Sequence, residues 1–225
     1  MLEVFCRRNA SNGLPVMWTI GELGISHIRH DVGGSFGGAR EAAYLAMNPN
    51  GRIPTLRDGG FVLWESNAIV RYLCRCYDRG ELLLPADERG YALADQWMDW
   101  HKTTLYPTYI DWFWAVVRTE PAIRDYKKIA ELRERMELSL EILDGQLGKA
   151  GFVLGDKLSM ADIPFGPLVF RYFELVGNGP SFRHIRNWYG KLQDRAAFRE
   201  HVMFPFGSNP GEWYLLEREL GRVTQ

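Results

Sequence analysis

Two short stretches lie close together in the chain: NGRIPTL at residues 50–56 and WESNAI at residues 64–69. A proline that opens a strand has no N–H for the sheet, and a cis bond before it would turn the backbone of Ile53 outward, free to pair with an extended ligand. The apolar spacing after Ser66 predicts a helix with this serine as its cap, and the free N–H groups there suit a carboxylate. Glu65 beside the cap suits an ammonium group. The two stretches together predict a site for a small acidic peptide.

The surrounding residues alternate between strand and helix patterns. Expected strands are residues 2–6, 27–32, 53–57 and 61–63, and expected helices are residues 15–23, 39–46 and 66–77. Alternation of period two marks the strands, helical spacing marks the helices, and the two glycines at 59 and 60 mark a hairpin turn. The resulting order, βαβαββα, is that of the thioredoxin fold.

Nearly everything after Asp87 has helical spacing. Expected helices are residues 88–118, 129–147 with one continuous apolar stripe, 159–176 and 185–192, followed by an irregular segment at 205–211. Ser159 and Asp162 form a capping box that should begin the third of these. The prediction is therefore α/β plus all-α: a thioredoxin-like domain over residues 1–80, a linker over 81–87 and an all-helical domain over 88–225.

Composition excludes several classes of protein. The chain has 225 residues, of which 46% are hydrophobic and 24% charged, and its formal net charge is −1. That charge argues against a nucleic acid or an anionic membrane as partner, and no stretch approaches the ~18 apolar residues of a membrane span. No secretory signal is visible, and three cysteines without framework spacing fit a reducing cytosol. The five histidines show no spacing typical of a metal site.

The chain resembles the glutathione S-transferase family, in particular bacterial members of the serine or asparagine type (theta- or nu-like), over nearly its whole length. The resemblance rests on NPNGRIP at residues 48–54, ESNAI at 65–69 and the box from Ser159 to Asp162, which occur in the family's order. It implies a homodimer that uses glutathione as co-substrate, without a metal, against a small hydrophobic electrophile. Glutathione is then expected to contact Arg52, Ile53, Pro54, Glu65 and Ser66.

The residue that activates the thiol departs from the family pattern. Many serine-type relatives have a serine where this chain has Ala10, but Ser11 and Asn12 follow it. Asn12-Gly13 resembles a bacterial subgroup in which an asparagine helps to hold the thiolate. A free thiol with a pKa of ~8.5 is only a few per cent ionised at neutral pH, so the site must favour the anion. Ser11 and Asn12 are the candidate catalytic donors, although both could instead only cap the first helix.

Aromatic residues are dense between residues 97 and 114, on the predicted long helix. Most of them are expected to fill the core, while Tyr109 and Trp112 are assigned to the electrophile pocket. Phe204 and Phe206 could cover the same opening. Cys74 and Cys76 are expected to be buried rather than to form a redox pair.

The sequence thus predicts a cytoplasmic glutathione transferase of the detoxification type. Two alternatives stay open from the residues alone. One is a glutathione-dependent reductase of disulfides or hydroperoxides, which the Asn12-Gly13 resemblance favours. The other is a non-catalytic binding or regulatory protein of the same fold, which Ala10 makes credible.

Overall fold

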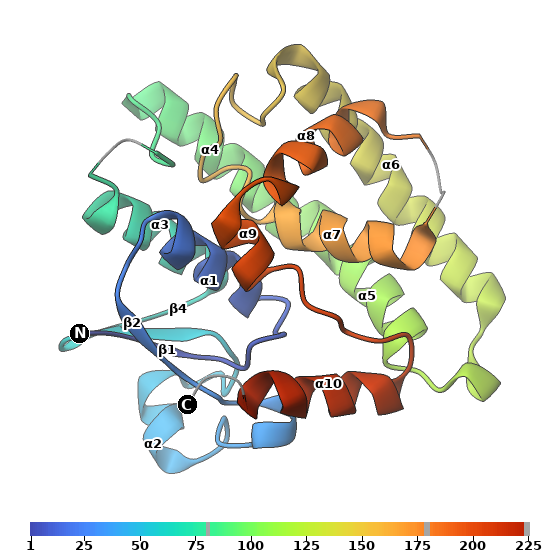
Figure 1. The fold of residues 1–225 in the computed structure, drawn as a ribbon, viewed down its shortest axis with the longest axis horizontal. Helices are drawn as coiled ribbons and strands as arrows, with labels where there is room; N and C mark the ends of the chain where they lie inside the picture. Colours follow the sequence, from blue (N-terminus) through green and yellow to red (C-terminus); the bar gives the residue numbers. More distant parts are fainter. Residues whose placement is uncertain (80–81, 178–180, 223–225) are drawn as a thin grey trace.

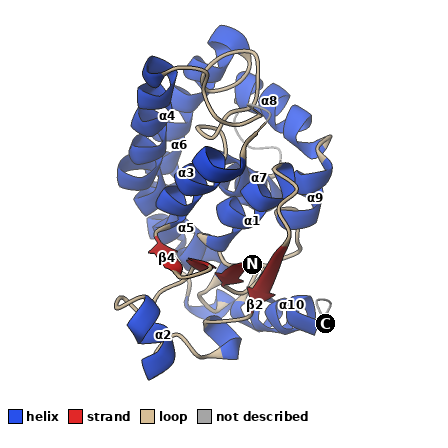
Figure 2. Ribbon diagram, turned by 90° about the vertical axis from the view of Figure 1, so that its left-hand side faces the viewer, coloured by secondary structure: helices blue, strands red, loops and turns tan. Residues whose placement is uncertain are grey.

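The structure is a computed structural model that describes residues 1–79, 82–177 and 181–222. Its sheet consists of β1 (Leu2–Phe5), β2 (His27–His30), β3 (Thr55–Asp58) and β4 (Phe61–Trp64). The strand order is β2-β1-β3-β4, in which β1 and β2 are parallel and β3 pairs antiparallel with β1 and β4. The sheet is accompanied by α1 (Gly13–Glu22), α2 (Ala42–Met47) and α3 (Ser66–Tyr77). Figure 2 shows α1 and α3 on one side of the strands and α2 on the other.

The rest of the described chain is helical. Its helices are α4 (Glu88–Trp100), α5 (Tyr106–Val117), α6 (Tyr126–Ala150), α7 (Phe165–Val176), α8 (Arg183–Gln193), α9 (Ala196–His201) and α10 (Pro210–Arg222). Three short segments are η1 (Gly34–Phe36), η2 (His101–Leu105) and η3 (Pro121–Ile123). The predicted fold class is confirmed: a thioredoxin-like domain precedes a helical one. One apolar core lies within the thioredoxin-like domain, and a larger one fills the helical domain and includes Trp18, Val70 and Cys74 from α1 and α3. The domain boundaries stay predictions, because residues 80 and 81 lie outside the described chain.

None of the helices in the described ranges combines the length and the apolar character needed to cross a bilayer.

The predicted single helix over residues 88–118 is wrong in its middle. A π-helical turn, η2, separates α4 from α5, and the Tyr106 N–H bonds to the His101 carbonyl. Pro107 follows immediately and has no N–H, so the regular ladder cannot continue through this point. Such turns often occur at functional sites, because they redirect side chains. Here the turn contains Lys102, which reaches the candidate site described below.

The predicted helix from Ser159 begins later than expected, at Phe165. Asp162 does reach back to the Ser159 N–H, at 2.9 Å, but the Ser159 hydroxyl donates to the same carboxylate at 2.9 Å instead of capping an N–H. Pro164 then provides the cap position of α7. The box therefore fixes the loop before the helix rather than the first turn of the helix itself.

The irregular tail predicted over residues 205–211 is wrong at its end, because α10 begins at Pro210. The Asn209 side chain caps this helix by accepting from the Glu212 N–H at 3.0 Å. Figure 1 shows α10 running back toward the N-terminal sheet. Glu217 anchors it there, through an ion pair to Arg7 at 2.5 Å and a bond from the Ser35 N–H at 2.8 Å. The segment around η1 therefore binds the last helix to the N-terminal domain.

The two cysteines of α3 have different environments. Cys74 is buried, as expected, but Cys76 is exposed. Positions two apart on a helix point to different sides, and only one of them faces the core. The prediction of burial is therefore wrong for Cys76.

The buried His101 side chain is expected to make the fold less stable at acid pH. Burial lowers the pKa of His101 to about 3, and the nearby Lys102 adds to this effect. Because the unfolded chain binds the proton more tightly than the folded one, the free energy of unfolding should fall as the pH drops below ~6.5, by about 1.4 kcal/mol per unit. We expect His101→Phe to flatten this slope in urea unfolding between pH 7 and pH 5. An equal slope in both proteins would show that His101 is not the cause of this pH dependence.

Candidate functional site

The turn between β1 and α1 carries Ser11 and Asn12, both partly exposed. Asn12 takes the cap position of α1, yet its side chain forms no capping bond. Instead its Oδ1 accepts from the Lys102 ammonium at 3.3 Å. The Ser11 Oγ accepts from Arg171 Nη1 at 2.6 Å. Each oxygen is thus held by a cation from the helical domain, and each side chain still has hydrogens to donate. The Ser11 hydroxyl also interacts with that of Tyr106.

Ala10 and Pro15 lie on either side of Ser11 and Asn12 in the chain. Ala10 is 2% exposed, and its methyl side chain has no donor for a ligand. Pro15 is the third residue of α1, not the first as expected, since the helix already begins at Gly13. An early proline is tolerated there, because the first N–H groups of a helix have no partner inside it.

The loop before β3 provides a second part of the site. The peptide bond between Ile53 and Pro54 is cis. In the described chain, neither the N–H nor the C=O of Ile53 forms a backbone hydrogen bond, so both are available to an extended ligand. The neighbouring carbonyl, that of Arg52, accepts from Tyr44 at 2.7 Å and from Asn48 at 2.8 Å, which fixes the loop. The Arg52 side chain is exposed.

The start of α3 provides the third part. Glu65, not Ser66, occupies the cap position, and Ser66 is the first helical residue. The predicted serine cap is therefore wrong by one position. Glu65 has φ at 73°, the single non-glycine residue with positive φ in the described chain. Backbone strain of this kind is kept where the surrounding structure requires it, often at ligand sites.

Lys102 joins the third part to the first. Its ammonium lies 3.8 Å from the Glu65 carboxylate as well as 3.3 Å from Asn12. Burial lowers the pKa of Lys102, and the Glu65 carboxylate opposes that effect. The nearby Arg52 charge lowers this pKa further.

Two cavities meet at Ser11 and Asn12. The smaller one is lined by Ser11, Asn12, Pro15, Ser66, Asn67, His101, Tyr106, Tyr109, Pro164, Pro167, Leu168 and Arg171. The larger one has a volume of about 120 Å³. Its lining consists of Arg7, Ala10, Ser11, Asn12, Ile53, Tyr106, Ile110, Phe113, Trp114, Arg118 and Trp213. The structure therefore brings Ser11, Asn12 and Ile53 together in one cavity and joins Ser66 to the first two in the other.

The predicted aromatic residues divide between site and core. Tyr109 is buried at the smaller cavity, with a hydroxyl that has no hydrogen-bond partner in the described chain. Trp112 lines neither cavity and packs against Tyr172 in the helical core. Phe206 contacts Phe113 from the tail, whereas Phe204 stacks under the Arg8 guanidinium, away from both cavities. The wall that faces Ile53 is formed instead by Ile110, Phe113, Trp114 and Trp213.

Sequence reasoning missed two residues of the site, Lys102 and Arg171. Arg171 is the one charged residue in the apolar run from Phe165 to Phe173. A cation inside a buried helix requires polar partners, so the position of Arg171 in this run is itself a signal for a polar site. Lys102 had no comparable signal, because its direction depends on the π-helical turn.

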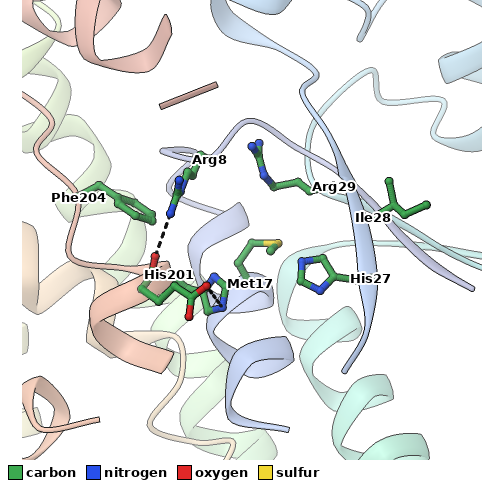
Figure 3. Close-up of a pocket in the computed structure, with 8 residues that line it drawn as sticks. Arg8, Met17, His27, Ile28, Arg29, His201 and Phe204 are labelled. Carbon is green, nitrogen blue, oxygen red and sulfur yellow. Dashed lines mark hydrogen bonds and ion pairs between the residues drawn. The ribbon is translucent and has the colours of Figure 1, made fainter. Parts of the chain in front are cut away.

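A wider cavity of about 350 Å³ lies elsewhere, between α1, β2 and α9. Figure 3 shows Arg8 and Arg29 along one edge of it and His27 and His201 beside Met17. Its two guanidinium charges are offset by Asp31, which pairs with Arg29, and by Glu200. Neither Ser11 nor Asn12 lines it, so the thiol-binding chemistry is not placed there.

Across the described ranges, no three His, Cys, Asp or Glu side chains gather as a metal site. Cys6, the thiol nearest to the turn in sequence, is fully buried, and burial raises its pKa to about 12. A protein thiolate is therefore not available beside Ser11.

Comparison with known proteins gives two matching family models. Residues 11–76 match the glutathione S-transferase N-terminal domain, and residues 105–195 match the glutathione S-transferase C-terminal domain. Among curated proteins, glutathione S-transferase GstB of Escherichia coli (strain K12) is 34% identical over 207 residues, covering 91% of this chain and 99% of the relative. Glutathione S-transferase F10 of Arabidopsis thaliana is 32% identical, over 89% of this chain and 95% of its own length.

Solved structures agree with these matches. A theta class glutathione S-transferase from Xanthomonas axonopodis pv. citri, crystallised with glutathione bound, is 39% identical and superposes with a TM-score of 0.86. That alignment covers 92% of this chain and 99% of the other. The apo form of the theta class enzyme from the same organism gives a TM-score of 0.79.

Proposed function

Since the chain belongs to the glutathione S-transferase family, an enzyme family that binds glutathione, we propose that it joins the glutathione thiolate to a small hydrophobic electrophile. The observation that carries this proposal is the meeting of Ser11, Asn12 and Ile53 in one cavity with an aromatic wall opposite them. A polar floor next to an apolar wall suits a charged nucleophile attacking an apolar partner.

The proposed binding mode uses each of the three parts. The free backbone groups of Ile53 pair with the peptide main chain of glutathione beside Pro54. The N–H groups at the start of α3, next to Ser66, receive the γ-glutamyl carboxylate, and Glu65 receives the neighbouring ammonium. Arg52 is a further candidate for the ligand's carboxylates, since its side chain is exposed and its charge also acts on Lys102.

The sulfur is then placed at the turn of Ser11 and Asn12. Ionisation breaks the S–H bond, releases the proton to solvent and leaves the electron pair on sulfur. Donors from Ser11 and Asn12 stabilise this anion, and the cations Arg7, Lys102, Arg118 and Arg171 give the surroundings a positive potential. The larger cavity seats the electrophile between Ile53 and the wall of Phe113 and Trp114. The sulfur anion uses its electron pair to form the bond to the electrophilic carbon, and a leaving group, halide in the case of an aryl halide, departs with the electron pair of the bond that breaks.

Glu65 provides the test of glutathione binding. The unmodified protein is expected to be retained on immobilised glutathione, and Glu65→Ala is expected to lose retention, with affinity lower by about 10- to 100-fold. The reason is the loss of a charge-assisted contact to the ligand ammonium, typically worth about 1.5–3 kcal/mol. Glu131→Ala, an exposed acid on α6, is the matched control and should be retained.

Two results would count against the proposal. Unchanged retention of Glu65→Ala would refute the binding site. Formation of glutathione disulfide from a hydroperoxide, with no conjugation of an aryl halide, would replace conjugation with the reductase alternative.

Two further expectations concern the location of the protein and its oligomeric state. All three cysteines are free, which fits the proposed cytosolic location. The homodimer stays a prediction. The large apolar side chains that such an interface could cover include Phe61 and Trp64 on the edge strand β4 and Leu93 on α4, all exposed.

A further inference from the structure

Arg171 is a buried cation without a counter-charge. Its side chain comes from the middle of α7, and the residue is 2% exposed. No Asp or Glu in the described ranges forms an ion pair with it; its neighbours are the rings of Phe113, Phe206 and Trp213, with centroids 4.9, 5.5 and 5.5 Å from the guanidinium carbon. Burying an uncompensated charge is costly, so the arrangement calls for a physical reason.

The hydrogen bonds of Arg171 point to that reason. Nη2 donates to the Asn9 carbonyl at 2.7 Å, and Nη1 donates to the Ser11 Oγ at 2.6 Å. One planar group therefore grips the turn that carries Ser11 at two points. A lysine could not reproduce this, because its ammonium lacks the fixed fork of a guanidinium.

The hydrogen bond from Arg171 makes the Ser11 hydroxyl available as a donor. A serine hydroxyl has one hydrogen and two lone pairs. Because a lone pair already accepts from Arg171, which has no acceptor of its own, the hydrogen must point to another acceptor. The larger cavity, which Ser11 and Tyr106 both line, holds the candidate acceptors: the Tyr106 oxygen beside Ser11 and the sulfur of a bound glutathione.

We propose that Arg171 is a positioning residue for the thiolate: it orients the Ser11 hydroxyl as a donor to the glutathione sulfur and provides the charge that the anion balances. This inference rests on the proposed function, because it needs glutathione in the cavity. The substrate anion is then the missing counter-charge of Arg171, which becomes paired only when ionised glutathione is bound.

The charge acts through the hydroxyl as well as through space. Donation from a guanidinium polarises the O–H bond, so the hydrogen bond from Ser11 to sulfur becomes stronger than that of an isolated serine. A cation within ~4–6 Å of an acid commonly lowers its pKa by about 1–3 units. Ionisation itself needs no further reactant, since the thiol proton leaves to solvent.

The test is a thiolate titration of bound glutathione by ultraviolet difference absorbance, in the full-length protein. We expect Arg171→Gln to raise the thiol pKa by about 1–2 units, which lowers the thiolate fraction at pH 6.5 by about 5- to 50-fold. Affinity for S-methylglutathione, whose sulfur cannot ionise, should change less than about threefold. Arg186→Gln is the matched control, because Arg186 is exposed on α8 against Phe173; its thiol pKa should equal that of the unmodified protein.

Arg171→Lys keeps the test valid if the glutamine variant does not fold. It retains the charge but not the two-point grip, so we expect a smaller rise of about half a unit to one unit. Coupling to Ser11 is the second readout. If Arg171 acts through the hydroxyl, its replacement should shift the thiol pKa less in a Ser11→Ala background than in the unmodified protein.

The outcomes distinguish a failure of the proposed function from a failure of the role of Arg171. If glutathione does not bind, or its bound thiol titrates at the ordinary ~8.5 in the unmodified protein, the proposed function fails. If the thiol pKa is lowered there and Arg171→Gln or Arg171→Lys leaves it unchanged, only the role of Arg171 is refuted. Equal shifts with and without the Ser11 hydroxyl would refute its action through Ser11.

Discussion

Ser11→Ala is expected to lower kcat/KM for conjugation about 50-fold at pH 6.5. The Ser11 Oγ accepts from Arg171 at 2.6 Å, so its own hydrogen can be donated to the sulfur. A bound thiol with a pKa of ~6.5 is half ionised at this pH, whereas a thiol of pKa ~8.5 is about 1% ionised. Removal of the hydroxyl therefore costs most of the reactive anion.

The pH dependence identifies the cause of this loss. Above pH ~9 the thiol ionises without help, so kcat/KM of Ser11→Ala should rise toward that of the unmodified protein. A structural defect would lower the rate equally at every pH. Ser139→Ala, a buried serine on α6 that lines neither cavity, is the matched control and should keep the original profile. A loss below fivefold at pH 6.5 would refute Ser11 as a thiol donor.

Asn12 is expected to matter less than Ser11. Its amide also keeps its hydrogens free, because Oδ1 is the atom that Lys102 holds. That contact is longer, at 3.3 Å, and Lys102 is shared with Glu65 at 3.8 Å. A weaker grip leaves the Asn12 side chain more conformational freedom to lose when it binds sulfur. The sequence left Ser11 and Asn12 as equal candidates. Their contacts to Arg171 and Lys102 make Ser11 the stronger candidate for the thiol donor.

The predictable parts of the site are local in sequence. Ile53 and Pro54 are neighbours, as are Glu65 and Ser66, and their chemistry follows from the backbone and helix start that they themselves form. The residues that complete the thiol environment come from far along the chain. Arg171 reaches Ser11 across 160 positions, and Lys102 reaches Asn12 across 90. Periodicity and spacing carry no information about such pairings.

The same distinction applies to the fold. The apolar stripe of α6 is repeated over many turns, so the pattern alone identified this helix. The interruption at η2 depends on one proline, Pro107, inside an otherwise regular pattern, and was missed. Helix α10 was missed because much of its stabilisation is tertiary: Glu217 meets Arg7, and Trp213 packs on Phe113.

Asp162→Ala should have the largest effect on stability. Its carboxylate is fully buried and accepts four hydrogen bonds of 2.9–3.0 Å. The donors are the backbone N–H groups of Val153 and Ser159, the Ser159 hydroxyl and the indole N–H of Trp188. One side chain therefore joins two points of the segment between α6 and α7, Val153 and Ser159, to Trp188 on α8.

Truncation leaves these donors buried without an acceptor, because Val153 and Trp188 are both fully buried. Each orphaned polar group costs about 1–3 kcal/mol, so the free energy of unfolding should fall by about 4 kcal/mol. Burial raises the pKa of Asp162 to about 6, so urea unfolding is to be measured at pH 7.5, where the carboxyl is ionised. Asp125→Ala is the matched control: Asp125 caps α6 by accepting one exposed N–H, that of Lys128, and its loss should cost only about 1 kcal/mol. If the two variants lose the same free energy, the buried network around Asp162 does not hold the helical domain together.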